Sequence, residues 1–388
     1  MDELVSVQLP GTIVVGAGAS DAVGEHAKRL AARRVLLVTD AYIAGQGLAE
    51  RFAALLEDEH VEVATFSDVQ PDPTDTNVLD GLAALRAHEA DAVVALGGGS
   101  VLDTAKMVAV LDRNEPPISQ YMGYHRLAAG GVPLIAVPTT AGTGSEATRV
   151  AVITDTAKDT KMMILDNHLL PAVALVDYEL SMSMPRPLTA HVGVDTLTHG
   201  IEAYVSVLAN PMSDPYALST IRLVAEHLET AWADPDDAPA RAAMAVAACQ
   251  GGVAFSNSSV ALVHGMSRPL GAIFHIAHGL SNSVLLPTVT RYSLEAAAHR
   301  YAAVARTMGY AGAADSDAAA AAALADGLEA LNERLEVPRL RDLPGVSEER
   351  FEASLEKMAA DALASGSPAR NPRVPSAAEI IALYREAF

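Results

Sequence analysis

Short apolar runs alternate with longer segments of mixed character through the first half of the chain. The runs are rich in valine, leucine and isoleucine, and most of them end at a glycine, a proline or an aspartate. Runs of this kind, separated by segments with helical periodicity, predict parallel strands whose connecting helices cover both faces of one sheet. The predicted strands are residues 12–15, 34–39, 61–66, 92–96, 134–137 and 172–176.

The second half has a different pattern, in which long alanine-rich segments repeat their apolar positions with helical spacing. Runs typical of strands are scarce after Pro185 and Pro187. Even the nearly uniform stretch 318–325 predicts a helix, because alanine is the strongest helix former. We therefore expect an α/β domain over residues 1–184 and an all-α domain over residues 185–388. The predicted helices of the second domain include residues 213–231, 238–254, 297–307 and 314–334.

Composition narrows the functional classes. The chain has 388 residues, half of them hydrophobic, and a formal charge of −21. Such an acidic surface repels phosphate backbones and disfavours nucleic-acid binding. We find no apolar run of the roughly 18 residues that suggest a membrane helix, and the first residues lack the order of a secretory signal, so we expect a cytoplasmic protein. Cys249 is the only cysteine, which excludes an internal disulfide and a cysteine-based metal site.

Two loops of small residues follow predicted strands and are candidates for phosphate binding. The first, Gly97-Gly98-Gly99-Ser100, precedes a predicted helix over residues 101–111. Glycines let backbone N–H groups approach a phosphate, and Ser100 can cap the helix while donating to that phosphate. A tight turn without a ligand is the alternative. The second loop, Thr139 to Glu146, is rich in hydroxyl groups.

Asp40 also ends a predicted strand. A carboxylate there can accept hydrogen bonds from the adenine ribose, and it would repel the extra phosphate of NADP, so it favours NAD. A simple helix cap is the alternative role. The stretch Gly16 to Asp21 begins like a dinucleotide fingerprint, but it has an aspartate where the third glycine belongs, and a plain turn explains it equally well.

A carboxylate and several histidines form a candidate metal site. Asp195 and His199 are four residues apart, which places both on one face of a helix, where they can share an ion. His264, His275 and His278 follow in an apolar, glycine-rich stretch. One carboxylate with three imidazoles suits a divalent first-row metal such as iron(II) or zinc. Each residue alone could be a surface pair or a hydrogen-bonded core histidine, but the set favours a metal.

Together these segments resemble the iron-containing (group III) alcohol dehydrogenase family. They lie in the order typical of that family, and they are GGGSVLDTAK (97–106), PTTAGTGSEATRVAVIT (138–154), GVDTLTHGIEAY (193–204) and HGMSRPLGAIFHIAHGLSNSVLLP (264–287). The resemblance implies the dehydroquinate synthase-like fold of this family. In that fold, an N-terminal α/β dinucleotide-binding domain and an all-α C-terminal domain enclose the active site in a cleft.

The resemblance also implies roles for single residues. The metal would be held by Asp195, His199, His264 and His278. We expect iron(II) in preference to zinc. The cofactor would be NAD(H), bound by Asp40, Gly97, Gly98, Gly99, Ser100, Asp103, Thr139, Thr140, Thr143, Ser145 and Lys161.

Arg268 departs from the family pattern. Many members have a second histidine four residues after the one that matches His264, and this chain has Arg268 there. An arginine stays protonated and is a poor general acid–base, so we expect proton movement through water, the cofactor ribose, His275 or His191. A guanidinium near the metal can instead bind an acidic group of the substrate. The alternative is that Arg268 pairs with an internal acid such as Glu202 or Asp155.

The predicted function is NAD(H)-dependent interconversion of a primary alcohol and its aldehyde, with the metal as a Lewis acid. Arg268 adds acid-bearing substrates as candidates: a hydroxy acid or semialdehyde, a phosphonate or a sulfonate. The alternatives are a lyase or polyol-phosphate dehydrogenase on the same scaffold, a metal-independent reductase of the maleylacetate reductase type, and a non-catalytic NAD-binding protein. The expected partners are a small alcohol or aldehyde and further copies of the chain, as a homodimer or a larger homo-oligomer.

Overall fold

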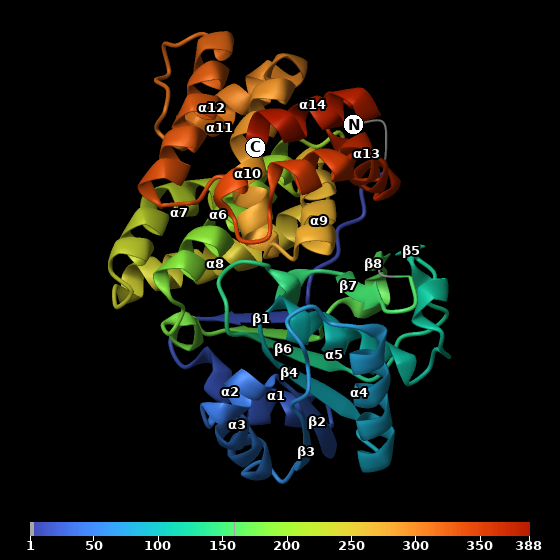
Figure 1. Cartoon of the computed structure of the whole chain (residues 1–388). Coiled ribbons are helices and arrows are strands. Elements are labelled where there is room, and N and C mark those ends of the chain that lie inside the picture. The colour runs from blue at the N-terminus through green and yellow to red at the C-terminus, as the bar shows by residue number, and fades with distance from the viewer. Residues whose placement is uncertain (1–3, 159) are drawn as a thin grey trace. The chain divides into compact units, whose positions relative to one another are not determined.

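The computed structural model describes residues 4–158 and 160–388, which form two compact units. The first unit is Gln8–Met182. The second is Ser183–Phe388, joined by residues 4–7 of the N-terminal segment. Figure 1 shows strands flanked by helices in the first unit and only helices in the second.

A six-stranded sheet forms the centre of the first unit, and all of its strand pairs are parallel. The strand order is β1-β9-β6-β4-β2-β3, so the chain crosses over between neighbouring strands, as parallel pairing requires. All six predicted strands are confirmed. They are β1 (Thr12–Val15), β2 (Arg34–Val38), β3 (Glu62–Phe66), β4 (Ala92–Gly97), β6 (Leu134–Pro138) and β9 (Val173–Val176).

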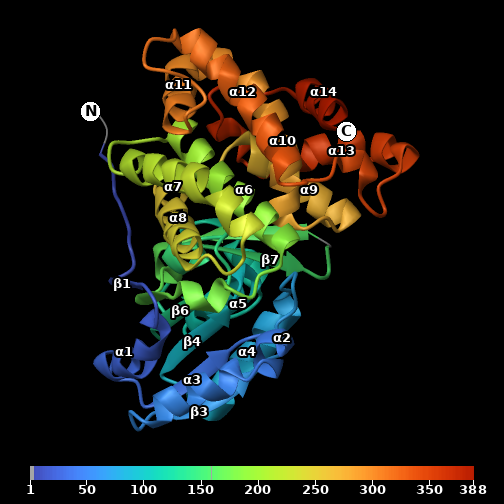
Figure 2. The same cartoon turned by 90° about the vertical axis from the view of Figure 1, so that its left-hand side faces the viewer.

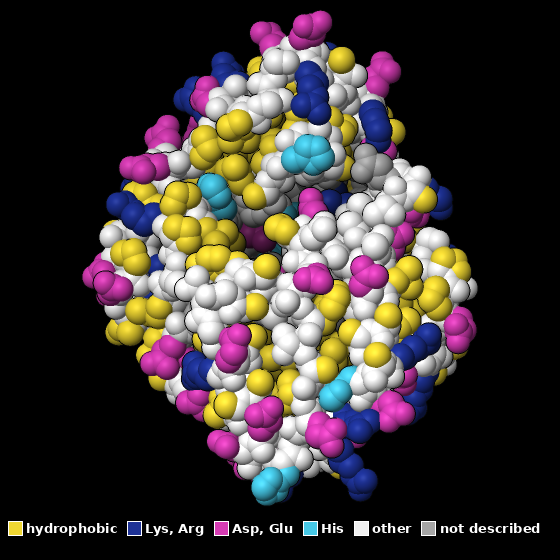
Figure 3. Space-filling model, turned by 60° about the horizontal axis from the view of Figure 1, so that its bottom comes forward, with side chains coloured by type: hydrophobic (Ala, Val, Ile, Leu, Met, Phe, Trp, Pro, Cys, Tyr) yellow, Lys and Arg dark blue, Asp and Glu magenta, His cyan; other side chains and the backbone are white. Residues whose placement is uncertain are grey.

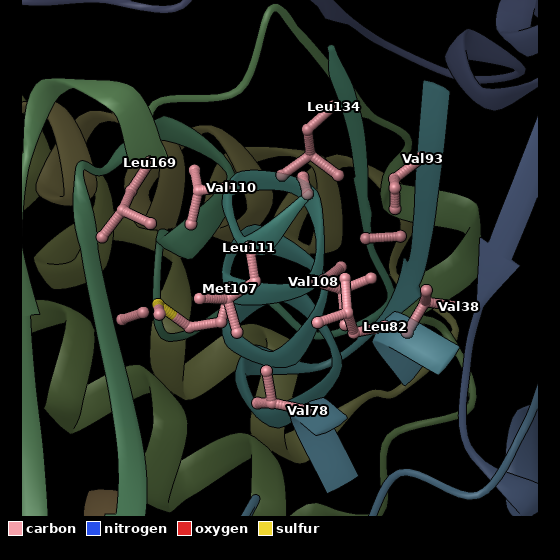
Figure 4. Packing of buried hydrophobic residues seen from close by; sticks show 14 of the residues in the cluster. Val38, Val78, Leu82, Val93, Met107, Val108, Val110, Leu111, Leu134 and Leu169 are labelled. Carbon is pink, nitrogen blue, oxygen red and sulfur yellow. The ribbon is translucent and has the colours of Figure 1, made fainter. Parts of the chain in front are cut away.

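Two hydrophobic cores cover the two faces of this sheet, because successive strand residues point to opposite sides. Val35 and Leu37 belong to the core with α1 (Val23–Arg29) and α3 (Leu48–Glu57), which the short helix α2 (Ala41–Gly45) precedes. Leu36 and Val38 belong to the opposite core, with α4 (Asp75–His88) and α5 (Gly99–Leu111). Figure 4 shows this second core, with Val78 and Leu82 of α4 and Met107, Val108, Val110 and Leu111 of α5 beside Val38, Val93, Leu134 and Leu169.

A second, three-stranded sheet was not predicted from the sequence. Its order is β5-β8-β7, with β5 (Gly123–Tyr124), β7 (Val150–Asp155) and β8 (Thr160–Leu165). β7 and β8 are antiparallel, and the residues of β7 alternate between buried and partly buried, the pattern of a sheet with one covered face.

The second unit is all-helical, as predicted. Its first helix, α6 (Arg186–Val205), packs against α7, α8 and α10, and Figure 2 shows these helices in one bundle. The four predicted helices correspond to α7, α8, α11 and α12. The helices after α6 are α7 (Asp214–Ala233), α8 (Ala238–Ser256), α9 (Leu262–Phe274), α10 (His278–Ser293), α11 (Ala298–Thr307), α12 (Asp317–Arg334), α13 (Glu348–Ala364) and α14 (Ala377–Ala387).

Glycines on α6 and α8 permit the close helix packing that buries the middle of α6. A Cβ atom at Gly200 would lie 3.1 Å from the backbone oxygen of Ala217 on α7. A Cβ atom at Gly251 of α8 would lie 3.5 Å from the Cβ atom of His199. Residues 193–203 of α6 are therefore buried on every side, polar side chains included.

The surface matches the acidic composition. Figure 3 shows acidic side chains spread over one face and interspersed with lysines and arginines, without a large basic patch on that face. Among the described helices, none combines the length and the apolar character needed to cross a membrane.

Candidate metal centre and cofactor loops

Helix α6 supplies two candidate metal ligands. Asp195 and His199 are one turn apart on it, and both side chains are almost fully buried. The Oδ1 atom of Asp195 lies 3.7 Å from the Nε2 atom of His199. Buried carboxylates and imidazoles are typically paired or bound to a metal, so this pair is a candidate for metal ligation.

Helices α9 and α10 supply the two other predicted ligands. The same Oδ1 atom of Asp195 lies 3.6 Å from Nε2 of His264 and 3.9 Å from Nε2 of His278. His264 is buried on α9, whereas His278 is the first residue of α10 and its side chain is 45% exposed. The His264 ring lies between the other two, with centroids 4.8 Å from His199 and 5.3 Å from His278.

These distances fit a divalent cation. Separations of 3.6–3.9 Å are too long for hydrogen bonds, but two ligands bonded to one ion at about 2.0–2.2 Å lie about 3–4 Å apart. Within the described residues, Asp195, His199 and His264 form the one group of three or more such side chains whose ligand atoms lie within 4.8 Å of one another. His278 lies at the edge of this group. The sequence prediction of a site built from one carboxylate and imidazoles is therefore consistent with the geometry.

Glu202 orients one of these imidazoles and was not predicted to do so. Its Oε2 atom lies 2.6 Å from Nδ1 of His264 and accepts a hydrogen bond from the N–H of Ala261 (2.8 Å). Its Oε1 atom accepts from the N–H of Val263 at 2.6 Å. Because a carboxylate only accepts, Nδ1 of His264 carries the proton, and Nε2 presents its lone pair to Asp195. The signal in the sequence was the position of Glu202 two turns after Asp195 on the same helix.

Arg268 and His275, the two predicted catalytic residues, lie on and just after α9. Arg268 is one turn beyond His264 and partly buried. His275 ends the helix in the left-handed region, with a φ of 57°, and is exposed. His191, the other candidate for proton movement, lies one turn before Asp195, and burial lowers its pKa. The roles of these residues remain predictions.

In the first unit, the two predicted cofactor loops lie side by side where β4 and β6 end. A Cβ atom at Gly98 would lie 3.5 Å from the side chain of Thr140. One at Gly99 would lie 2.9 Å from that of Thr143, closer than a side chain tolerates. The N–H of Thr139 donates to the backbone oxygen of Gly97 at 3.0 Å. A side chain at position 99 would therefore displace the side chain of Thr143, and glycine lets the two loops lie in contact.

Ser100 and Asp40 were the two residues considered as possible helix caps, and only one of them caps a helix. Ser100 is not the helix cap: α5 begins at Gly99 with Gly98 at the cap position, and the Ser100 hydroxyl donates to the backbone oxygen of Pro71. The prediction was wrong because the helix starts two residues earlier than predicted, within the glycines. Asp40 does cap a helix, α2, since its Oδ1 atom accepts from the N–H of Ile43 at 2.9 Å. Its binding to a ribose remains a prediction.

A buried charged network joins the two cofactor loops, and Asp103 and Ser145 belong to it. The Ser145 hydroxyl donates to Oδ1 of Asp103 at 2.7 Å, and Oδ2 of Asp103 accepts from the N–H of Val152 at 2.9 Å. Lys106, whose side chain is fully buried, donates to Ser145 (2.7 Å), Thr148 (2.9 Å) and the backbone oxygen of Val150 (2.8 Å). The network ties α5, which starts in the first loop, to the second loop and to β7.

We expect Lys106→Met to weaken NADH binding about tenfold and to lower the free energy of unfolding by about 3–5 kcal/mol, because it leaves the largely buried carboxylate of Asp103 without its cation. Burial lowers the pKa of Lys106 from 10.5 to about 8. The folded protein therefore releases this proton at a lower pH than the unfolded chain does. As the pH rises from 8 to 10.5, the free energy of unfolding of the wild type should increase relative to that of the variant. Urea unfolding and NADH fluorescence titration measure both effects. Lys28→Met, at an exposed ion pair, is the control; unchanged NADH binding in Lys106→Met would contradict the prediction.

Lys161, the last predicted cofactor residue, lies on β8. Its Nζ atom pairs with Oδ1 of Asp72 at 2.7 Å, and its side chain is mostly buried. If Lys161 binds the cofactor, its ammonium group must either leave Asp72 or contact Asp72 and the cofactor together.

Comparison with known proteins gives matches over both units. The family model described as "Iron-containing alcohol dehydrogenase" matches residues 10–178, and "Fe-containing alcohol dehydrogenase family, C-terminal" matches residues 189–388. The NAD-dependent methanol dehydrogenase of Bacillus methanolicus is 38% identical over 380 residues, which cover 98% of this chain and 99% of that protein.

Solved structures agree. The 1,3-propanediol oxidoreductase structure superimposes with a TM-score of 0.96 at 38% identity and covers all of both chains. The sulfoacetaldehyde reductase from Bifidobacterium kashiwanohense, solved in complex with NAD+, gives a TM-score of 0.87 at 29% identity and covers 99% of each chain. The predicted fold class is confirmed, and so, at the level of the family, are the predicted alcohol–aldehyde chemistry and the NAD and metal cofactors. The chain belongs to the iron-containing alcohol dehydrogenase family.

Proposed function

We propose that the protein interconverts a small primary alcohol and its aldehyde, with NAD(H) as the hydride carrier and a divalent metal held by Asp195, His199, His264 and His278. The observation that carries the proposal is the meeting of one buried carboxylate oxygen with three imidazole Nε2 atoms at 3.6–3.9 Å. A cation bound there would supply Lewis-acid polarisation of a substrate oxygen.

The protein side chains supply orientation and charge. Asp195 contributes the negative charge that makes the site attractive to a cation, and Glu202 holds His264 in the tautomer that leaves Nε2 unprotonated. In the first unit, the network of Lys106, Asp103 and Ser145 holds the two loops that we propose bind the pyrophosphate of NAD(H). The hydroxyl proton of the alcohol would leave through water, the cofactor ribose, His275 or His191.

Iron(II) is the metal that we propose, in preference to zinc. The family description supports iron, and a donor set of one carboxylate and three imidazoles accepts it. Metal analysis of protein purified under anaerobic conditions tests this choice directly.

An acid-bearing substrate is the second part of the proposal. Arg268 lies one helical turn from His264, and a guanidinium is well suited to pair with a carboxylate, phosphonate or sulfonate. The similar sulfoacetaldehyde reductase is named for an aldehyde that carries such a group. Arg268 would then select the substrate without taking part in proton transfer.

The test follows NADH oxidation by metal-stripped protein before and after anaerobic reconstitution with iron(II) or zinc. Pentanal and succinate semialdehyde serve as neutral and anionic substrates. We expect turnover only with metal, and a preference for succinate semialdehyde that Arg268→His removes. Turnover that survives stripping would favour a metal-independent reductase of the maleylacetate reductase type, and NADH binding without any turnover would favour a non-catalytic protein. An unchanged preference in Arg268→His would leave the metal proposal intact and refute the substrate clamp.

A homodimer or larger homo-oligomer in the cytoplasm remains our prediction for the state of the protein. Light scattering of the purified chain would determine the number of copies.

A further inference from the structure

Helix α9, which carries His264, contains a proline. Pro269 lies five residues after His264, inside the helix. A proline has no backbone N–H, so it cannot donate the usual helical hydrogen bond to the backbone oxygen of Gly265, four residues earlier, and its ring crowds that oxygen. The turn of α9 that presents the proposed ligand therefore receives less support from its own helix than a turn of an uninterrupted helix does.

A tyrosine hydroxyl from α14 bonds to the same turn. Tyr384 donates to the backbone oxygen of Met266 at 2.6 Å. Met266 follows His264 by two residues, within the stretch that Pro269 weakens. The donor and the acceptor are 118 residues apart in the sequence, so the bond supports α9 from outside, where its own series of hydrogen bonds is incomplete.

The surroundings of Tyr384 fix its hydroxyl on that oxygen. The ring is completely buried, and it lies edge-on to Phe351 of α13 with the ring centroids 6.5 Å apart. Burial raises the pKa of Tyr384 well above its ordinary value, so the hydroxyl keeps its proton and remains a donor. A buried hydroxyl strongly favours keeping its acceptor, because losing it leaves the group unsatisfied. Tyr384 is therefore a fixed point for α9.

Two further contacts hold this turn between other elements. Gly265 packs against Pro368 of a short helix, η8 (Pro368–Arg370), and a Cβ atom at Gly265 would lie 2.7 Å from Cγ of Pro368. Glu202 of α6 accepts a hydrogen bond from the N–H of Val263 at 2.6 Å. Helix α6 thus fixes the residue before the candidate ligand, and η8 and α14 fix the two residues after it.

We propose that the hydroxyl of Tyr384 positions the turn of α9 from which His264 binds the metal, in place of the backbone support that Pro269 removes. Tyr384 is thus a positioning residue, which acts through the backbone of α9. The ligands of a metal site must be held to within about 0.5 Å of their productive geometry, so a less constrained turn lowers the affinity. This inference rests on the proposed function, because it requires that His264 is a metal ligand.

The test titrates metal-stripped wild type and Tyr384→Phe with cobalt(II) in competition with a chelator. Cobalt(II) binds the same nitrogen and oxygen donors as iron(II) and zinc. Tyr384→Phe removes one oxygen atom and keeps the ring, and we expect it to bind cobalt about three- to tenfold more weakly, the effect of one hydrogen bond. The analogue 4-aminophenylalanine at position 384 restores a donor, and we expect it to recover the wild-type affinity. Unchanged affinity in Tyr384→Phe would overturn the proposal.

The Pro269→Ala background tests the link to the proline. Alanine returns a backbone N–H for the oxygen of Gly265, so α9 can support its own turn. Because the two substitutions are then coupled, we expect Tyr384→Phe to change the cobalt affinity by less than about twofold in this background. An equal loss of affinity in both backgrounds would show that the hydroxyl does not replace the backbone support, and the proposal would fail.

Tyr121→Phe is the matched control, because it removes the same kind of bond from the first unit. The buried Tyr121 hydroxyl donates to the backbone oxygen of Glu115 at 2.7 Å. We expect this variant to keep the cobalt affinity of the wild type, and urea unfolding checks that each variant is folded at the temperature of the titration. A loss of cobalt affinity in Tyr121→Phe equal to that in Tyr384→Phe would reduce the effect to general stability and contradict a positioning role.

Failure of the proposed function gives a different result. If wild type itself takes up no cobalt, or if His264→Ala binds cobalt as tightly as the wild type, the proposed role of His264 is refuted and Tyr384 has no ligand to position. If wild type binds cobalt and His264→Ala does not, the metal centre stands, and the Tyr384 variants then decide the positioning role alone.

Discussion

Asp195→Asn is expected to remove metal binding and to lower kcat/KM for aldehyde reduction by about a thousandfold or more. The change keeps the shape of the side chain but removes the only carboxylate among the four proposed ligands. Oδ1 of Asp195 is the atom on which the three imidazoles converge, at 3.6–3.9 Å, so its charge acts on the whole site. Metal content after anaerobic reconstitution and steady-state NADH oxidation measure the two effects.

The control for this prediction is Asp326→Asn on α12, which removes an equal charge from an exposed ion pair. It should retain metal and activity. Normal metal content together with normal activity in Asp195→Asn would place the ion elsewhere. Normal metal content with lost activity would make Asp195 a catalytic group without a ligand role.

Glu202→Gln is expected to weaken metal binding about 10- to 100-fold, although Glu202 is not a proposed ligand. The carboxylate accepts from three donors: the N–H groups of Ala261 and Val263 and Nδ1 of His264. An amide has only one acceptor oxygen, so at least one backbone N–H at the start of α9 loses its partner. An amide N–H beside His264 would also favour the tautomer with its proton on Nε2, facing Asp195.

The same substitution should lower the free energy of unfolding by about 1–3 kcal/mol, since a buried donor is left unsatisfied. Titration with cobalt(II) and urea unfolding of the metal-free protein separate the two effects. Glu226→Gln, on the surface of α7, should change neither. If Glu202→Gln loses stability but binds cobalt normally, Glu202 supports only the helix and does not position the ligand.

The arrangement of strands and helices was largely predictable because buried positions are apolar and recur along the chain with the spacing of each kind of element. A strand covered on both faces, such as β4 with its six buried residues, is a continuous apolar run. The pair β7 and β8 was missed because it alternates buried with partly buried residues and carries lysine and threonine among its apolar positions. The start of α5 was misplaced by two residues, since consecutive glycines do not indicate where a helix begins.

The site was predictable where spacing alone brings residues together. Asp195 and His199 are four residues apart on one helix, and that spacing fixes their relation before any folding is considered. Glu202 was not identified as the residue that orients His264, because that role depends on distances between α6 and α9. Asp103 and Ser145 were selected as cofactor residues, yet the sequence gave no sign that they bond to each other and to a buried Lys106.

The position of the ligands along the chain has a consequence for how the second unit holds together. Asp195 and His199 come from α6, and His264 and His278 come from α9 and α10, with the whole of α7 and α8 between them in sequence. A metal bound by all four would therefore cross-link the segment between His199 and His264, as a disulfide bond cross-links distant residues in other proteins. The single cysteine of this chain excludes an internal disulfide. The metal proposed for catalysis would therefore also stabilise the helical bundle, and the melting temperature would rise with the concentration of metal.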